Sequence, residues 1–372
     1  MPQFPPAQPG MLLAEVDTPA LLLDLDAFER NLQRLQDSLA GRRILLRPHA
    51  KSHKCPQIAL RQIARGAVGV CCQKVSEAEA MVEGGVPDVL IANEVVGASK
   101  LRRLAALATQ AKVTVCADDE GNVRDIDAAA REFGVVIDVL VEVNVGANRC
   151  GVEPGEPALK IAQAIAACAN LRYAGLQAYQ GGAQHLRKTE ERRAAIDAAV
   201  AGVQQTLALI DKAGLPRGKV TGAGTGTYLF EAASAVYDEL QVGSFIFMDV
   251  DYAKNDWTES GIPRFEHSLF VYATVMSRTR PDTAVVDAGL KASSVDSGMP
   301  RVADCTQAEF VRASDEHGVI RLNGAPGFAL GDKVRLIPGH CDPTVNLYDH
   351  YVCFRGDRVE ALWPITARGA VW

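Results

Sequence analysis

Segments with the patterns of strands and helices alternate along residues 44–247, and this alternation narrows the possible folds more than any other feature. Helical runs such as Val75–Glu83 and Thr189–Ala213 separate short apolar runs. The strand-like runs are Ile44–Arg47, Val68–Cys72, Val89–Ala92, Val113–Ala117, Ile137–Val143, Tyr173–Tyr179, Lys219–Gly222 and Glu239–Phe247. Alternating strands and helices predict a parallel sheet, and eight such units favour a closed (β/α)8 barrel over an open sheet.

The pattern changes after Trp257. From Ser268 onward, short strands with turn signals replace the helices, which predicts a C-terminal antiparallel β domain. We therefore expect a Pro-rich leader over residues 1–16, an α/β barrel over residues 17–257 and the β domain over residues 258–372. The leader can pack against the β domain.

Composition and charge exclude several classes of function. The chain of 372 residues has a formal net charge of −6 and a sequence pI near 5.7, which argues against nucleic acid as a partner. Its nine cysteines form no Cys-x-x-Cys pair, and reduced thiols in the cytosol fit this odd number better than a disulfide framework. We therefore expect a cytoplasmic enzyme with small-molecule ligands, no signal peptide and no membrane span.

A basic stretch, Arg47-Pro-His-Ala-Lys-Ser-His-Lys54, follows the first predicted strand. A lysine at this end of a barrel strand can face the active site, and its amine can form a Schiff base with an aldehyde cofactor. Glycine-rich stretches follow the seventh and eighth strands, at Thr221-Gly-Ala-Gly-Thr-Gly226 and Gln241-Val-Gly-Ser244, where barrels bind phosphate. Taken alone, the basic stretch is equally well explained as a solvated loop, and a tight turn is the more frequent explanation for the glycines. Together they predict a pyridoxal 5'-phosphate site at Lys51.

Polar side chains at other strand ends are further candidates. Gln73 follows the second strand, Arg149 the fifth, and Tyr179 and His185 the sixth. Arg149 carries a permanent charge that suits the phenolic oxygen of the cofactor, and Tyr179 can stack on or bond to the cofactor. Histidine titrates near neutrality, so His185 can serve as a base. Each of these side chains has an alternative role, which is to satisfy nearby backbone groups.

A second group of candidates lies in the predicted β domain, within Pro338-Gly-His-Cys-Asp-Pro. His340 and Asp342 are two residues apart, so on an extended segment both side chains point the same way and can hold a divalent cation. Cys341 then points away as a structural thiol. Water or substrate would complete the coordination shell. By spacing alone, however, a hydrogen-bonded turn is the more frequent explanation for a His-x-Asp pair.

Several stretches of the chain resemble the D-threonine aldolases and their near relatives, the 3-hydroxy-D-aspartate aldolases. They are Arg47-Pro-His-Ala-Lys-Ser-His-Lys-Cys, Val70-Cys-Cys-Gln-Lys-Val-Ser-Glu-Ala, Asn93-Glu-Val-Val, Leu176-Gln-Ala-Tyr, Thr221-Gly-Ala-Gly-Thr-Gly, Asp287-Ala-Gly-Leu-Lys, Asp315-Glu-His-Gly and His340-Cys-Asp-Pro-Thr. The similarity extends over nearly the whole chain, from about Asp17 to Gly369. It implies an enzyme of the alanine-racemase-like pyridoxal phosphate fold (fold type III), a divalent metal, usually manganese or magnesium, and a homodimer with active sites near the subunit contact.

The resemblance also implies roles for individual residues. Lys51 would be the Schiff-base lysine, His185 the catalytic base, and His340 and Asp342 the metal ligands. The residues expected to contact the cofactor are Lys51, Gln73, Arg149, Tyr179, Thr225, Gly226, Gly243 and Ser244. The chain departs from the family pattern at Gln180, where the family often has histidine, and at Ala223, where it often has glycine.

These expectations favour retro-aldol cleavage of β-hydroxy-D-amino acids of the D-threonine type to glycine and an aldehyde. A 3-hydroxy-D-aspartate aldolase would release glyoxylate as the aldehyde. A D-serine or 3-hydroxyaspartate dehydratase would give a keto acid and ammonia, but its metal pair is typically His-x-Cys, and Asp342 favours the aldolases. A racemase would need a second base opposite Lys51 and no metal. A cofactor-carrying, non-catalytic protein with this barrel typically lacks the β domain.

Overall fold

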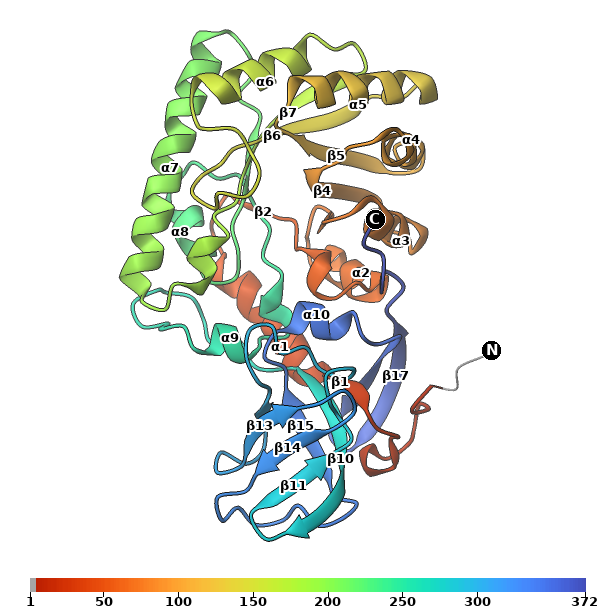
Figure 1. Ribbon diagram of the computed structural model, residues 1–372. Helices are drawn as coiled ribbons and strands as arrows, with labels where there is room; N and C mark the ends of the chain where they lie inside the picture. The colour runs from red at the N-terminus through yellow and green to blue at the C-terminus, as the bar shows by residue number, and fades with distance from the viewer. Residues whose placement is uncertain (1–4) are drawn as a thin grey trace.

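The computed structural model describes residues 5–372 and contains a barrel, at the top of Figure 1, and a β domain below it. The eight parallel barrel strands are β2 (Leu45–Leu46), β3 (Val70–Cys72), β4 (Asp88–Glu94), β5 (Lys112–Ala117), β6 (Ile137–Glu142), β7 (Leu171–Ala178), β8 (Lys219–Gly222) and β9 (Glu239–Leu240). They lie in the order β2-β9-β8-β7-β6-β5-β4-β3, and a hydrogen bond of 2.8 Å from Cys71 N to Pro48 O joins the two ends. The predicted barrel is confirmed.

Helices cover the outside of the barrel. They are α2 (Pro56–Ala64), α3 (Val75–Glu83), α4 (Ala98–Leu107), α5 (Glu120–Phe133), α6 (Glu156–Ala166), α7 (Thr189–Lys212) and the short α8 (Tyr228–Ala233). Alternate residues of each strand pack on the helices or fill the interior, because successive side chains point to opposite faces. On β6, Val139 and Val141 pack with the helices, whereas Leu140 packs inside with Leu90 and Cys116. The outward face is apolar, whereas the interior also holds polar side chains, such as Arg47 and Glu239, which form a buried ion pair beside Leu90 and Leu140.

The β domain is built on one nine-stranded sheet. Its strands are β1 (Ala20–Asp24), β10 (Leu269–Arg280), β11 (Thr283–Val286), β12 (Arg301–Val302), β13 (Glu309–Ala313), β14 (Gly318–Arg321), β15 (Lys333–Ile337), β16 (His350–Arg355) and β17 (Arg358–Pro364). The main path runs β13-β14-β11-β10-β1-β16-β17, with β15 also pairing with β10 and β12. All of these pairs are antiparallel except β1 with β16, so the predicted antiparallel domain is confirmed.

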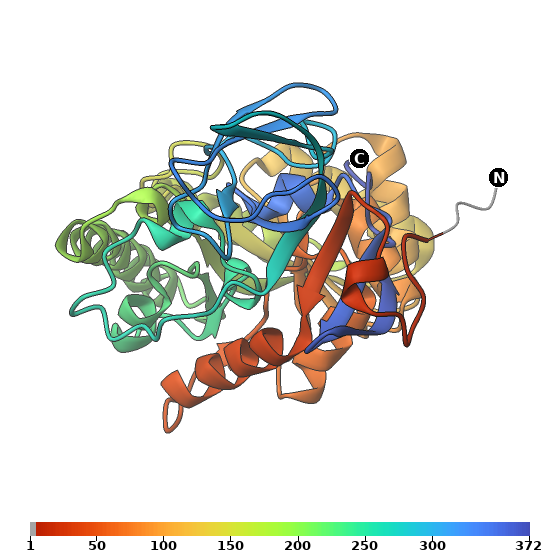
Figure 2. The same ribbon diagram turned by 90° about the horizontal axis from the view of Figure 1, so that it is seen from below.

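Strand β1 corrects the boundary expected between the two domains. Residues 17–257 were predicted to form the barrel, but β1 lies between β10 and β16 in the second sheet (Figure 2). Leu22 faces both Phe270 and Val352 in the two registers. The run Ala20–Leu23 is fully buried and apolar on both faces, so its sequence does not indicate which of the two sheets it joins. Helix α1 (Leu25–Ser38) then crosses from the β domain to the barrel, which begins at β2.

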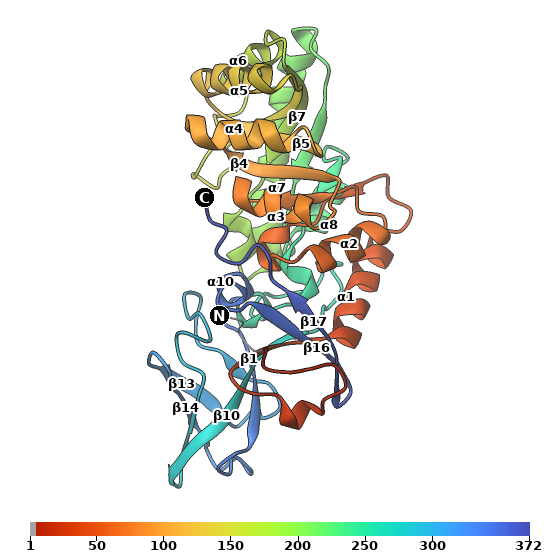
Figure 3. The same ribbon diagram turned by 90° about the vertical axis from the view of Figure 1, so that its right-hand side faces the viewer.

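Both ends of the described chain pack on neighbouring elements. The leader, of which residues 5–16 are described and residues 1–4 lie outside the described part, follows β17 through Gly10 N to Val359 O (2.8 Å) and Leu13 N to Asp357 O (2.7 Å). At the other end the chain returns from the β domain to the barrel beside α3, where Ser76 N donates to Trp372 O (Figure 3). Within residues 5–372, none of the helices has the length and apolarity needed to cross a membrane.

Candidate active site

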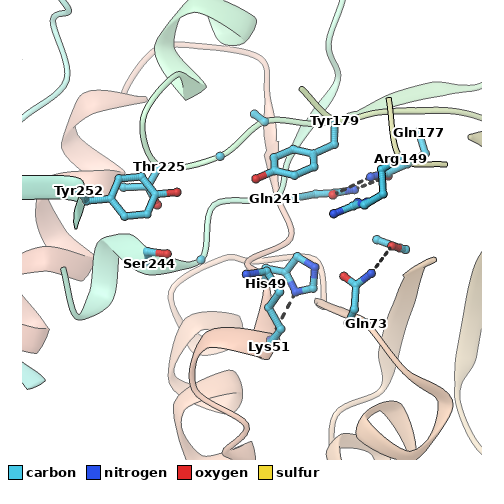
Figure 4. Close-up of a pocket in the computed structure, with 14 residues that line it drawn as sticks. His49, Lys51, Gln73, Arg149, Gln177, Tyr179, Thr225, Gln241, Ser244 and Tyr252 are labelled. Atoms are coloured by element: carbon cyan, nitrogen blue, oxygen red, sulfur yellow. Dashed lines mark hydrogen bonds between the residues drawn. The ribbon is translucent and has the colours of Figure 1, made fainter. Parts of the chain in front are cut away.

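A pocket of about 510 Å³, partly open to solvent, lies at the carboxyl ends of the barrel strands (Figure 4). This is the end at which barrel enzymes place their active sites. The lining residues come from the loops after most of the strands: His49, Lys51, Gln73, Ala92, Arg149, Gln177, Tyr179, Ala223, Gly224, Thr225, Gln241, Gly243, Ser244 and Tyr252.

Lys51 lies in a short 3-10 turn, η2 (Ala50–Ser52), directly after β2. Its ammonium forms an ion pair with Asp342 of the β domain. Burial lowers the pKa of the Lys51 amine, but Asp342, Tyr179 and Glu77 together outweigh burial, with Asp342 contributing most, so the pKa lies above its usual value. The nucleophilic form of a lysine is the uncharged amine. A free amine at Lys51 is therefore favoured when another cation engages Asp342.

The two glycine loops, residues 222–226 and 243–244, form one end of the pocket. Gly224 lies against Gln184, and an added Cβ would lie 2.5 Å from Gln184 Oε1. Within residues 5–372, the backbone N–H groups of Gly224, Thr225, Gly243 and Ser244 have no hydrogen-bond acceptor. Converging free N–H groups on glycine-rich backbone bind phosphate oxygens. This end of the pocket therefore suits a phosphate group.

The opposite end of the pocket carries Arg149 and Gln73, as Figure 4 shows, and Lys51 and Tyr179 lie between the two ends. Gln73 is fixed by its neighbours, since its backbone N–H donates to Glu77 at 2.5 Å and its side-chain amide donates to Ala92 O at 3.3 Å. A site with anion-binding backbone at one end, hydrogen-bond donors at the other and a lysine between them fits pyridoxal phosphate.

Two carboxyl groups, Glu94 and Glu142, lie close to Arg149 and shape its electrostatic surroundings. Burial, and then the charge of Glu94, raises the pKa of Glu142 to about 8. Burial also raises the pKa of Glu94. Neither Glu142 Oε2 nor Glu94 Oε1 has a hydrogen-bond partner within the described chain. Like charges in one buried site disfavour double ionisation, so this pair holds a proton at neutral pH.

The raised pKa of Glu142 predicts a pH-dependent effect of Glu142→Gln. Burial favours the protonated form of Glu142 in the native wild type. The wild type therefore has its full stability below the unfolded-state pKa of Glu142 and loses stability as the pH rises through about 8. The glutamine variant has no such loss. We expect urea unfolding to show that the stability of the variant relative to the wild type rises by about 2–4 kcal/mol between pH 5.5 and pH 9. An equal difference at both pH values, or one shared by the exposed control Glu83→Gln, would contradict this.

His185 lies at the rim of the pocket and does not line it. It ends the 3-10 turn η3 (Gly182–His185), and its ring centroid is 6.5 Å from that of Tyr252, which does line the pocket. His185 Nδ1 is 2.9 Å from Asp251 Oδ2, and Arg187 binds the other oxygen of Asp251. A proton on Nδ1, donated to Asp251, leaves Nε2 as the acceptor that a general base needs.

Arg192 holds the loop that carries His185 in place. This arginine is fully buried in α7, and its guanidinium donates to Leu186 O (2.9 Å), Arg187 O (2.8 Å) and Asp256 O. Replacing Arg192 by methionine keeps the apolar stem but leaves these buried carbonyls without their donor. We expect the free energy of unfolding to fall by about 2–4 kcal/mol in urea titrations. The exposed neighbour provides the control, because Arg193→Met should change stability by less than about 1 kcal/mol. Equal effects of the two variants would disprove the role of Arg192.

His340 and Asp342 lie at the start of a helix, which corrects the extended geometry expected from the sequence. His340 is the N-cap of α10 (Cys341–Val345), and Asp249 binds both Cys341 N (3.1 Å) and Tyr252 N (2.9 Å), the latter in α9 (Val250–Ala253). Proline in the first turn, here Pro343, also favours helix initiation. As a result the two side chains have different partners, since Asp342 contacts Lys51 and His340 contacts Asp296.

The surroundings of His340 and Asp342 still suit a divalent cation. Asp342 Oδ1 is buried and has no hydrogen-bond partner within residues 5–372. Burial raises the pKa of Asp342, but the charges of Lys51 and His340 outweigh burial and lower it, so the carboxylate is ionised. The described chain contains no group of three or more His, Cys, Asp or Glu side chains placed to hold a metal. A metal here would take two protein ligands and complete its shell with water or substrate.

Most of the residues predicted to contact a cofactor lie together in the pocket. They are Lys51, Gln73, Arg149, Tyr179, Thr225, Gly243 and Ser244. Gly226 does not line it, because its N–H is turned away and donates to Gln184 Oε1 at 2.8 Å. The two departures from the family pattern lie beside it. Ala223 lines the pocket with a positive φ of 73°, which favours glycine, whereas the Gln180 amide donates to Val145 O at 3.1 Å and is not part of the lining.

Four polar or aromatic residues that line the pocket were not predicted from the sequence: His49, Gln177, Gln241 and Tyr252. One of them carried a usable signal. Gln177 is two residues before Tyr179 in the predicted strand Tyr173–Tyr179, so strand alternation places both on the same face. Burial lowers the pKa of His49 to about 3, which keeps this imidazole neutral. Gln177 and Gln241 form a buried amide pair at 2.6 and 3.0 Å.

Comparison with protein families identifies both parts of the chain. Residues 23–251 match the alanine racemase N-terminal domain, and residues 268–354 match a serine dehydratase domain. The first match covers more than half of the 372 residues. The fold and the pocket therefore define a barrel enzyme of the pyridoxal phosphate type.

Curated relatives narrow this class. The chain is 47% identical to a 3-hydroxy-D-aspartate aldolase of Paracoccus denitrificans, covering 98% of this chain and 95% of the relative. It is 48% identical to a D-threonine aldolase of an Arthrobacter species, covering 98% and 96%. A crystal structure of D-threonine aldolase from Filomicrobium marinum superposes with a TM-score of 0.97 at 52% identity, covering 99% and 100%. The chain belongs to the family of D-threonine aldolases and 3-hydroxy-D-aspartate aldolases, as the resemblance implied.

A more distant relative has a different reaction in its name. The D-threo-3-hydroxyaspartate dehydratase of Delftia sp. HT23 has a TM-score of 0.85 at 27% identity, covering 95% of this chain and 98% of that one. The barrel and β domain are thus shared by proteins named for aldol cleavage and for dehydration.

Proposed function

We propose that this enzyme cleaves β-hydroxy-D-amino acids to glycine and an aldehyde, using pyridoxal phosphate and a divalent metal. The observation that carries the proposal is the direct contact between Lys51 of the barrel and Asp342 of the β domain. It brings the lysine that would bind the cofactor beside the carboxylate that would bind the metal. Aldolase relatives at 47% and 48% identity support the retro-aldol reaction.

In this proposal the pocket residues hold the cofactor at both ends. Thr225, Gly243 and Ser244 bind the phosphate through backbone N–H and hydroxyl groups, and Arg149 binds the phenolic side of the ring. Gln73 and Tyr179 make the remaining predicted cofactor contacts, whereas Gly226 fixes the loop through Gln184. Pyridoxal phosphate, when bound, supplies an electron sink for the carbanion left at Cα. Lys51 would be the residue that holds the cofactor, and the barrel keeps its amine in the pocket, where its effective concentration is high.

His340 and Asp342 are the proposed metal ligands, with manganese or magnesium as the candidate ions. The unpartnered Asp342 Oδ1 and the free Nε2 edge of His340 would face the ion, because His340 Nδ1 is engaged by Asp296. A bound divalent cation lowers the pKa of a coordinated hydroxyl group. His185, oriented by Asp251, would accept the proton from the β-hydroxyl directly or through water. This loss of the proton precedes cleavage of the Cα–Cβ bond.

The substrate has two candidates within the same reaction. One relative is named for D-threonine, which yields acetaldehyde, and another for 3-hydroxy-D-aspartate, which yields glyoxylate. We propose the D-threonine type as the first choice and the 3-hydroxy-D-aspartate type as its alternative. Dehydration to a keto acid and ammonia is the third candidate and is supported by the 27% identical dehydratase.

Product analysis tests these proposals. D-threonine and 3-hydroxy-D-aspartate are each supplied with manganese, without it, and with a chelator. Metal-dependent glycine with acetaldehyde or glyoxylate is the expected result and ranks the two substrates. Ammonia with a keto acid would overturn the aldolase in favour of the dehydratase. Glycine formation that a chelator does not reduce would overturn the metal requirement.

We further propose that the enzyme is a cytoplasmic homodimer. Nine free thiols among the described residues suit a reducing compartment. The family resemblance supports the dimer, and light scattering coupled to size exclusion would give about twice the chain mass of 39.8 kDa if it forms.

A further inference from the structure

We infer that Asp296 is a positioning residue that fixes the tautomer and orientation of His340, so that His340 Nε2 faces the metal. This inference rests on the proposed metal pair of His340 and Asp342. The observation behind it is the contact of 2.9 Å between His340 Nδ1 and Asp296 Oδ2. Asp296 lies 44 residues before His340, in the loop between β11 and β12.

Two serine hydroxyl groups also fix the orientation of the Asp296 carboxylate. Ser294 Oγ donates to Asp296 Oδ1 at 2.8 Å, and Ser297 Oγ donates to Oδ2 at 2.9 Å. Each carboxylate oxygen therefore accepts a hydrogen bond from a serine, and Oδ2 also contacts His340, which restricts rotation of the carboxylate. An acceptor held in this way can select one orientation of the imidazole ring, because only one ring nitrogen can then carry the donated proton.

The loop that carries Asp296 is also tied to the helix that carries the metal pair. Ser294 N donates to Thr344 Oγ1 at 3.2 Å, and Thr344 Oγ1 donates to His340 O at 2.8 Å. A single threonine of α10 thus connects the loop to the backbone of His340. These two hydrogen bonds connect the loop to the helix, so the fold sets the position of Asp296 relative to His340.

A carboxylate behind a ligating histidine has a defined chemical effect. With its Nδ1 proton donated to Asp296, His340 keeps the lone pair on Nε2 that a metal requires. Without this acceptor the His340 ring can rotate and exchange tautomers. Metal binding must then fix both the ring orientation and the tautomer, which lowers the affinity. Loss of such an outer partner typically weakens metal affinity about 10–100-fold. Because the side chains of His340 and Asp296 are 28% and 47% exposed, their contact itself adds little to folding stability.

Manganese binding to the pyridoxal phosphate-loaded enzyme, measured by calorimetry without substrate, tests the inference. We expect Asp296→Ala to weaken manganese binding about 10–100-fold with an unchanged melting temperature. Asp296→Asn should stay within a few-fold of the wild type, because its amide oxygen still accepts the Nδ1 proton. The surface variant Asp304→Ala, on the same domain, should match the wild type.

Two sets of outcomes separate this inference from the proposed function. Wild-type affinity in Asp296→Ala would overturn the positioning role while leaving the metal site intact. An Asp296→Asn variant as weak as Asp296→Ala would also overturn it, since the carboxylate would then act through its charge or as a ligand. No manganese binding by the wild type, or wild-type affinity in His340→Ala, would instead overturn the proposed metal site and the inference with it.

Discussion

Replacing Lys51 by alanine is expected to abolish turnover of β-hydroxy-D-amino acids, lowering kcat by at least about a thousandfold. Lys51 supplies the pocket's amine between the phosphate-binding loops and Arg149. Its removal should also eliminate the visible absorbance band of lysine-bound cofactor, even where the glycine loops still retain the phosphate. Steady-state kinetics and absorbance spectra of purified protein give both readouts.

Lys51→Arg separates the chemistry of the lysine from its charge. Arginine keeps a cation beside Asp342 but does not lose its proton in proteins, so it cannot act as the nucleophile. We expect this variant to fold like the wild type and to be as inactive as Lys51→Ala. The exposed Lys100→Ala is the control for unrelated lysine loss. Turnover within tenfold of the wild type in either Lys51 variant would reject Lys51 as the cofactor lysine.

Replacing Asp342 by alanine is expected to lower activity by at least about a hundredfold, with no recovery on addition of manganese. The change removes one of two proposed protein ligands. It also removes the carboxylate that raises the pKa of Lys51, so burial then lowers that pKa. The loss should therefore appear as a weaker manganese affinity in calorimetry together with a lower kcat.

Asp304→Asn provides the matched control, since Asp304 pairs with Arg335 on the surface of the same domain. It should retain both manganese affinity and activity. A fully active Asp342→Ala enzyme that also resists chelators would show that Asp342 has no role in metal binding. Activity lost with manganese affinity unchanged would assign Asp342 to its contact with Lys51 alone.

The barrel was predictable because its signals are local and repeat. Helix α3 has the same bounds as the run Val75–Glu83 read from the sequence, since amphipathic periodicity depends only on near neighbours. The last predicted strand was too long, because Glu239–Phe247 contains two strand residues followed by a 3-10 turn at Ser244–Ile246. Apolar composition alone does not distinguish such a turn from a strand.

The structural features that could not be predicted from the sequence depend on contacts between residues far apart in the chain. Strand β1 could not be assigned to the β domain because its partners lie about 250 and 330 residues away in β10 and β16. The helix at α10 depends partly on Asp249, which binds Cys341 N from the other domain. For the same reason the contacts of His340 with Asp296 and of Asp342 with Lys51 emerge only in the folded chain.

The origin of the site in two domains has a consequence for how such enzymes diversify. In the proposed arrangement, the barrel contributes Lys51 and the glycine loops, whereas α10 contributes His340 and Asp342. Retention of the cofactor and the choice of the bond to be broken are then encoded in separate stretches of the gene. Substitutions in α10 would then alter the metal ligands while leaving the glycine loops for the phosphate unchanged, although Asp342 also contacts Lys51. Such a division is consistent with the fold that this chain shares, at a TM-score of 0.85, with a protein named as a dehydratase.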